Sequence, residues 1–217
     1  MKQGKWKPEE IEKKSFSIIE KECTEQGIFV PEEMKSIVFR AIHATADFDY
    51  ARTLVFSDNA VEEAQKAIRS GASIVTDTNM ALAGISRRTL DRLNCRAFCY
   101  MADESVASEA SRRGITRASV SMERAVKISG SVIFAVGNAP TALMTLYEKI
   151  KKGYRPALVI GVPVGFVNVE EAKELILSSG IPYIVNRGRK GGSTVAAAIV
   201  NALLYEADPS RGGEYSL

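Results

Sequence analysis

The only histidine of the chain, His43, is the first residue to consider for chemistry. An unperturbed imidazole titrates near neutral pH, so a single one is a natural group for moving a proton. At about 100° per residue, three other polar residues fall on the same helix face as His43, namely Ser36, Arg40 and Asp47. This polar stripe is typical either of a solvated surface helix or of a catalytic face that borders a cleft or a subunit interface.

A second group of candidates lies in four polar or glycine-rich stretches, each after a run that resembles a strand. They are Thr76–Met80, Gly137–Thr141, Gly161–Phe166 and Asn186–Thr194. The last stretch is basic, with Arg187, Arg189 and Lys190, and it directly precedes a predicted helix over 195–205. Free backbone N–H groups at a helix start, together with these cations, favour an anion such as a carboxylate or a phosphate.

Other common sites fit the sequence less well. The basic stretch departs from a P-loop because no lysine directly precedes Ser193, and no Gly-x-Gly-x-x-Gly follows the first predicted strand. A nucleotide-dependent enzyme therefore remains only an alternative hypothesis. The three cysteines, Cys23, Cys95 and Cys99, form no Cys-x-x-Cys pair, so we expect reduced, buried thiols and no metal site.

The elements that would position these residues follow an alternating pattern. Two helices come first, one from Pro8 to a stop at Gly27 and one that starts at Pro31 and carries His43. Short apolar, β-branched runs then follow at 53–56, 73–76, 97–100, 131–136, 157–160 and 182–185. Between them we expect four helices. Asp58 caps the first, the second fills roughly 104–113, Pro140 opens the third, and Asn168 with Glu171 forms a capping-box-like start for the fourth.

This alternation predicts an α/β fold, a three-layer α/β/α architecture with a mainly parallel sheet, preceded by two N-terminal helices. In such a sheet the loops at the carboxyl ends of the strands build the site. The four polar or glycine-rich stretches would therefore meet at one edge.

Composition limits the class of protein. The 217 residues are 46% hydrophobic, which predicts a single globular domain over residues 1–217. A net charge of +3 gives no sign of nucleic-acid binding. The charged start, Met1–Lys7, lacks an apolar signal region, and no apolar run approaches the roughly 18 residues of a membrane span. We therefore expect no membrane partner and a cytoplasmic location.

Five motifs, taken in order, connect the chain to a known family. They are Ser15-Phe16, Arg40-x-x-His43-Ala44, Gly137–Leu143, Pro163–Val167, and Arg187-Gly-Arg189 through Gly191-Gly192-Ser193. In these motifs, and over nearly its whole length, the chain resembles the precorrin-8X methylmutases of corrin (cobalamin) biosynthesis, including the cobalt-precorrin-8 methylmutases of the anaerobic route.

The resemblance implies a homodimer that moves a methyl group from C-11 to C-12 of a tetrapyrrole macrocycle, with no separate cofactor. It implies that His43 is catalytic and works near the ring C nitrogen. It also implies substrate contacts by Ser15, Arg40 and Arg117. The family has a variable polar turn at Asp77, Thr78 and Asn79, where we expect substrate contact. The substrate's many carboxylates make Arg187, Gly192 and Ser193 plausible partners.

The residues suit this chemistry independently. A [1,5]-sigmatropic methyl shift needs no nucleophile, metal or hydride carrier; it needs one tautomer held in place and a proton donor or acceptor, which a single imidazole supplies. A non-catalytic corrinoid carrier that uses the same pocket remains an alternative hypothesis. In a symmetric dimer, a helix face that is exposed in one chain can close the pocket of the partner.

Overall fold

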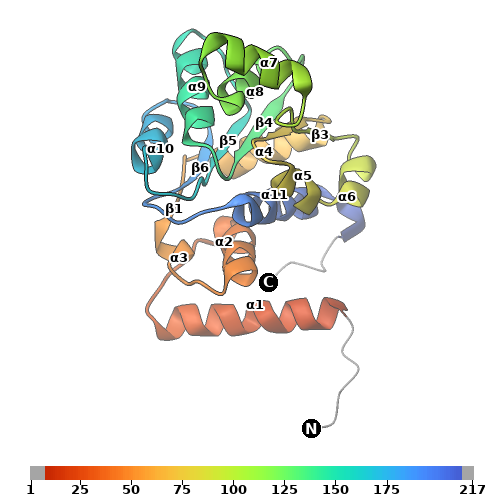
Figure 1. The fold of residues 1–217 in the computed structure, drawn as a ribbon. Coiled ribbons are helices and arrows are strands. Elements are labelled where there is room, and N and C mark those ends of the chain that lie inside the picture. The colour runs from red at the N-terminus through yellow and green to blue at the C-terminus, as the bar shows by residue number, and fades with distance from the viewer. Residues whose placement is uncertain (1–7, 212–217) are drawn as a thin grey trace.

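A computed structural model describes residues 8–211, and within this range six strands form one sheet with helices on both faces (Figure 1). The strands are β1 (Leu54–Phe56), β2 (Ser73–Thr76), β3 (Arg96–Phe98), β4 (Val132–Val136), β5 (Leu158–Gly161) and β6 (Tyr183–Asn186). They lie in the order β1-β6-β5-β4-β2-β3, and every neighbouring pair is parallel except β1 with β6. The predicted three-layer, mainly parallel architecture is confirmed.

Two sets of helices enclose the sheet. One face is covered by α7 (Glu104–Arg113), α8 (Arg117–Ala125), α9 (Pro140–Lys151) and α10 (Val169–Leu177). The other face is covered by α4 (Ala60–Arg69), α5 (Asn79–Gly84), α6 (Arg87–Arg92) and α11 (Ser193–Ala207). Because both faces are covered, every residue of β4 and β5 is buried, which explains their continuous apolar sequence.

The N-terminal helices form a further layer beyond α11 (Figure 1). They are α1 (Pro8–Glu25), α2 (Glu32–Thr45) and the short α3 (Tyr50–Thr53). Helix α11 is apolar on nearly all sides because it lies between the sheet and α2. In turn α1 packs on α2, where the rings of Phe16 and Phe39 meet edge to face at 6.3 Å. This packing of α1 on α2 fixes the orientation of the α2 face that carries His43.

Two predicted caps are wrong. Helix α4 begins at Ala60 after Asn59, so Asp58 is not its cap, and no side chain caps this helix. Asn168 adopts a left-handed backbone (φ 56°) and its side chain makes no cap hydrogen bond, so the capping box with Glu171 does not form. The predictions also missed the short helices α3, α5, α6 and α8, two of which are capped by Thr78 and Thr116.

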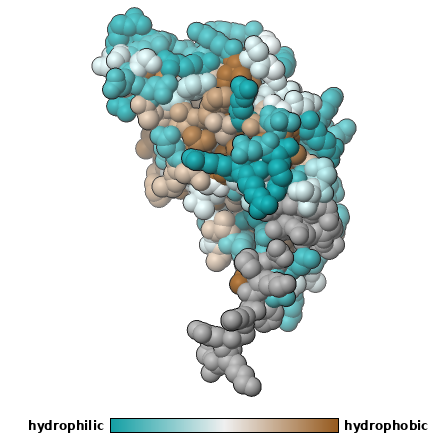
Figure 2. All heavy atoms as spheres, turned by 90° about the vertical axis from the view of Figure 1, so that its right-hand side faces the viewer, coloured by the Kyte–Doolittle hydropathy of each residue, from teal (hydrophilic) through white to brown (hydrophobic). Residues whose placement is uncertain are grey.

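The surface of the molecule beyond edge strand β3 presents both apolar and hydrophilic residues. Figure 2 shows apolar residues gathered at mid-height on this side, with hydrophilic residues around them. Cys95 and Cys99 flank β3, and all three cysteines are free thiols; Cys23 and Cys95 are buried as predicted, whereas Cys99 is only half-buried. No helix within residues 8–211 is long and apolar enough to cross a membrane. The prediction for Met1–Lys7, and the last six residues of the predicted domain, lie outside the described range.

Candidate active site

A hollow of about 400 Å³ opens between α2, α5 and α11. It lies beside the carboxyl edge of the sheet because α5 follows β2 and α11 follows β6. Its lining residues are Arg40, His43, Ala44, Met80, Gly84, Thr194, Ala197, Ala198 and Asn201. Asn201 ties two walls together, because its amide donates to Gly84 O at 2.8 Å and its oxygen accepts from Ser86 N at 2.9 Å.

His43 is exposed on the last turn of α2 and borders this hollow. The ring of Phe16, from α1, meets the imidazole edge to face at a centroid distance of 5.9 Å. No group in the described part of the chain hydrogen-bonds to either imidazole nitrogen. The packing thus orients the ring while leaving both nitrogens available for a ligand.

The rest of the predicted polar stripe is engaged with other elements. The Ser36 hydroxyl donates to the carboxylate of Glu206, and Asp47 accepts from Lys190 Nζ at 2.5 Å. Ser36 therefore joins α2 to α11. Asp47 is not on the helix face as predicted, because α2 ends at Thr45 and Ala46 has a left-handed backbone; it joins the segment after α2 to the glycine-rich loop. The interpretation of this face as a solvated surface does not hold for them.

Arg40 forms part of the wall. Its guanidinium pairs with Glu12 at 2.5 Å and lies over the rings of Phe16 at 5.3 Å and Tyr205 at 4.8 Å. Only 13% of its side chain is exposed. Arg40 thus connects α1, α2 and α11 behind His43, and it borders the hollow with part of its surface.

Two predicted substrate contacts meet at the end of the hollow. The hydroxyls of Thr78 and Ser193 are hydrogen-bonded at 2.7 Å, although 115 residues separate them. Thr78 also caps α5 by accepting from Ala81 N at 3.0 Å. Asn79 is exposed next to it, and the neighbouring residues Met80 and Thr194 line the hollow itself. The polar turn after β2 and the start of α11 therefore form one continuous rim.

The glycine-rich loop between β6 and α11 continues this rim. Lys190 pairs with Asp47 and Asp49, and Arg189 lies 3.4 Å from Glu170. The expectation that all three basic residues attract an anion is therefore too simple, since two of them already pair with carboxylates. Arg187 is exposed and has no ion pair within residues 8–211.

Comparison with known proteins decides the family. The family model for precorrin-8X methylmutase matches residues 10–206. The chain belongs to this family. It is 43% identical over 202 residues to a cobalt-precorrin-8 methylmutase of Priestia megaterium, a match that covers 93% of this chain and 89% of that one. It is 40% identical over 200 residues to a precorrin-8X methylmutase of Pseudomonas aeruginosa, covering 90% and 94%.

A solved structure of a precorrin-8X methylmutase from Thermus thermophilus shares the fold, with a TM-score of 0.84 and 39% identity. The match covers 92% of this chain and 98% of that chain. The isomerase class expected from the sequence is therefore confirmed. The resemblance noted in the sequence motifs extends to the whole arrangement of strands and helices.

Asp77, at the end of β2 in this methylmutase, has a structural role that the sequence does not reveal. It is fully buried and accepts from the backbone N–H groups of Gly137, Asn138 and Ala139 at 2.8, 2.8 and 2.6 Å. Burial raises the pKa of its carboxyl group, and the three N–H donors act in the opposite direction. Asp77 thereby holds the turn between β4 and α9 to the end of β2, and this turn packs against the start of α11.

Gly137 shows how close that approach is. A Cβ atom on Gly137 would lie 2.8 Å from Ser193 Cα and 2.9 Å from Gly192 O. No residue larger than glycine fits without moving the start of α11. The Gly137 motif of the methylmutase and the predicted contact residues Gly192 and Ser193 are thus parts of one packed unit.

Two predicted contacts lie away from the hollow. Ser15 donates to Ile11 O at 2.8 Å within α1 and is not among the residues that line the hollow. Arg117 is exposed at the start of α8, on the opposite face of the sheet from His43. The neighbouring Thr116 hydroxyl meets the Thr141 hydroxyl at 2.9 Å, which ties the start of α8 to the start of α9.

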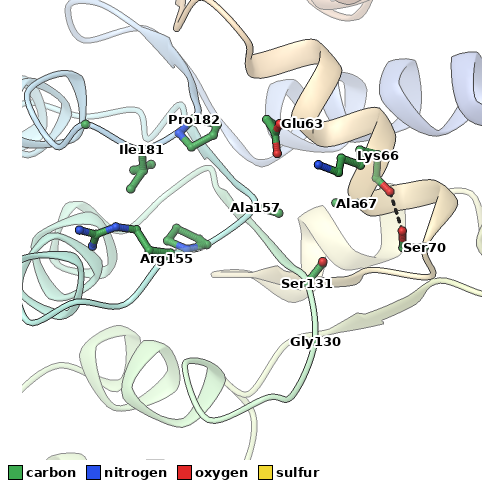
Figure 3. A pocket seen from close by; sticks show the side chains of 12 residues that line it. Glu63, Lys66, Ala67, Ser70, Gly130, Ser131, Arg155, Ala157, Ile181 and Pro182 are labelled. Atoms are coloured by element: carbon green, nitrogen blue, oxygen red, sulfur yellow. Dashed lines mark hydrogen bonds between the residues drawn. The ribbon is translucent and has the colours of Figure 1, made fainter.

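A second hollow, of about 450 Å³, lies at the amino edge of the sheet (Figure 3). It lies where α4 ends and where β4, β5 and β6 begin. Figure 3 shows the Arg155 side chain extending away from Lys66, and its guanidinium donates to Ile150 O at 2.9 Å. Polar side chains line this hollow too, among them Glu63, Lys66 and Ser131. No group of three or more histidine, cysteine or acidic residues that could hold a metal occurs within residues 8–211.

Proposed function

We propose that this protein catalyses the [1,5]-sigmatropic shift of a methyl group from C-11 to C-12 of precorrin-8X or cobalt-precorrin-8, giving hydrogenobyrinate or cobyrinate. His43 would donate or accept the proton near the ring C nitrogen. The observation that carries this proposal is the placement of His43, exposed in the hollow with no hydrogen-bond partner among the described residues.

The methyl group stays within the substrate, so the protein has to hold and polarise the macrocycle. A positioned proton donor or acceptor typically contributes about 10²- to 10⁴-fold to the rate. We propose that Thr78, Asn79, Arg187, Gly192 and Ser193 bind substrate carboxylates. Their support is the continuous rim from the Thr78–Ser193 hydroxyl pair to the glycine-rich loop.

We further propose that Arg40, Ser15 and Arg117 contact the substrate in a homodimer. The hollow of one chain is open and, at about 400 Å³, is near the low end of the roughly 300–1,000 Å³ typical of small-ligand pockets. A second copy would enclose a large pigment and add contacts that one chain lacks. The exposed apolar side chains of Met80 and Phe166 (69% and 83%) support an additional covering surface.

The extent of the domain, the cellular compartment and the metal content of the substrate also belong to the proposal. We propose that residues 1–217 act as one domain in the cytoplasm, where three free thiols would stay reduced. Because relatives named for the cobalt-containing and for the metal-free substrate match to a similar extent, both substrates belong in the assay.

The test compares the wild type with His43→Ala on both substrates, with products extracted after denaturation and identified by mass and absorption spectrum. We expect the variant to lose conversion and to keep binding the pigment. Lys66→Ala, at the other hollow, is the matched control and should convert substrate normally. If the wild type only shifts the pigment spectrum reversibly and yields no new compound, the protein is a corrinoid carrier instead.

A further inference from the structure

Lys173 is a buried cation for which the proposed reaction has no direct use. It lies on α10 with 1% of its surface exposed, and its ammonium group donates to Gly188 O at 2.6 Å and to Lys190 O at 2.9 Å. Both acceptors belong to the glycine-rich loop. Burial lowers the pKa of Lys173 to about 8, so the group is still mostly charged at neutral pH.

Further hydrogen-bond donors in the body of the protein bind the carbonyl groups of this loop. The Asn186 amide donates to Arg187 O at 3.2 Å and to Lys190 O at 2.9 Å. Gly165 N donates to Arg189 O at 3.2 Å. All four carbonyl groups of residues 187–190 therefore accept hydrogen bonds from α10, from the end of β6 or from the loop after β5.

This arrangement determines where the loop amides point. In a trans peptide the C=O of one residue and the N–H of the next point in opposite directions. With the carbonyls of 187–190 turned toward the protein, the N–H groups of 188–191 turn away from those donors. No acceptor for these four N–H groups occurs within the described part of the chain. A row of outward amides beside Arg187 is suited to a carboxylate.

Gly191 keeps this arrangement close to the neighbouring loop. A Cβ atom on Gly191 would lie 2.0 Å from Val162 O, so only glycine allows this approach. The next residue, Gly192, donates its N–H to Val162 O at 2.8 Å. The loop is thus anchored at its end by backbone contact and along its length by Lys173 and Asn186.

A buried ammonium group without a carboxylate partner is unfavourable for stability, and a neutral side chain of similar length would fill the same space. Within residues 8–211, Lys173 forms no ion pair. Its position beneath a loop whose N–H groups of residues 188–191 have no acceptor among the described residues points to a functional role, in which Lys173 orients the loop and adds a positive charge behind the amides.

We propose that Lys173 is a positioning residue that presents the N–H groups of residues 188–191 as a preformed cradle for one carboxylate of the substrate. The proposal rests on the proposed function, because it assumes that the tetrapyrrole binds along this rim. Lys173 itself does not touch the substrate.

The test measures KM and kcat of Lys173→Met with the substrate. It also measures the dissociation constants of the product as the free acid and as the methyl ester. Loss of a charge-assisted hydrogen bond should raise KM and the dissociation constant for the acid by about 10- to 100-fold. We expect kcat to change by less than about threefold, because the imidazole is untouched. The ester should bind the variant and the wild type equally, which a general loss of structure would not produce.

Lys149→Met is the matched control, since Lys149 lies in the last turn of α9, at the amino edge of the sheet, and pairs with Glu123 at 3.2 Å. Asn186→Leu removes the other donor and should weaken acid binding in the same way, which keeps the proposal testable if Lys173→Met does not fold. Wild-type acid affinity in either folded variant would overturn the proposal. A wild type that binds the product without turnover would instead refute only the proposed function.

Discussion

The two edges of the same sheet carry hollows of similar volume, about 400 Å³ and 450 Å³, but the backbone presents opposite polarity at each. Helices α5 and α11 begin at the carboxyl edge, whereas α9 and α10 end at the amino edge. Helix N-termini carry partial positive charge and C-termini partial negative charge. A ligand rich in carboxylates is therefore favoured at the edge that carries His43, and cavity size alone does not identify the site.

The turns at the two edges are also held differently. At the amino edge they close on their own helices, as in the bonds from Gly71 N to Ile68 O and from Gly153 N to Ile150 O. At the carboxyl edge, buried side chains hold the loops from a distance, with Asp77 on one turn and Lys173 on another. Where a buried side chain hydrogen-bonds to the carbonyl groups of a loop, the N–H groups of that loop stay available for a ligand. Where it bonds to the N–H groups, the carbonyl groups stay available.

The largest effect should come from His43→Ala. Without the imidazole, kcat should fall by about 10²- to 10⁴-fold, while the product dissociation constant changes little. Single-turnover conversion of bound substrate measures this directly. Conversion at the wild-type rate would remove the carboxyl-edge hollow as the site of chemistry.

Gly191→Ala should be next, because its Cβ would collide with Val162 O. We expect a loss of about 1 to 3 kcal/mol in the free energy of unfolding and a higher KM. Gly130→Ala, at the amino edge, is the comparison: a Cβ there meets nothing within 4 Å, but the backbone has φ +86°. The strained backbone of this alanine should lower the free energy of unfolding by about 1 to 2 kcal/mol, and KM should stay at the wild-type value. Equal kinetic effects of the two variants would contradict the contrast between the edges.

Asp77→Asn tests the support beneath the turn between β4 and α9. One carboxylate oxygen accepts from Gly137 N and the other from Asn138 N and Ala139 N, whereas an amide has only one acceptor oxygen, so either the first bond or the other two would be lost. Chemical denaturation should show a loss of about 1 to 3 kcal/mol. Asp58→Asn is the control, since Asp58 is exposed and caps no helix. A stability equal to that of the control would show that the turn does not depend on Asp77.

The smallest effect should come from Lys66→Ala in the amino-edge hollow. Lys66 is exposed on the last turn of α4. Removal of an exposed side chain away from special features usually changes stability by less than about 0.5 kcal/mol. Turnover should also remain within about twofold of the wild type. A marked rise in KM would indicate that the larger hollow takes part in substrate binding.

The fold was predictable because its signals are local. Continuous apolar runs such as Val132–Val136 mark strands that are buried on both faces, and His43 stood out as the only imidazole. The caps at Asp58 and Asn168 failed because polar side chains near a helix start do not all take the cap geometry, and Asn168 has a left-handed backbone.

The supporting residues of the site could not be identified from sequence. Lys173 has the pattern of an ordinary surface lysine until the loop 15 and 17 residues later folds over it. The pairing of Lys190 with Asp47 likewise joins residues 143 positions apart. Side-chain type predicts what a loop can bind, but only the packed structure tells which charges are already paired.

The most direct test of the central claim is a crystal structure of the wild type with the corrinoid product bound. We predict that the macrocycle lies at the carboxyl edge, with His43 within hydrogen-bond distance of a ring nitrogen and a carboxylate on the amides of residues 188–191. A macrocycle seated in the amino-edge hollow, or bound with His43 remote from the ring, would contradict the account.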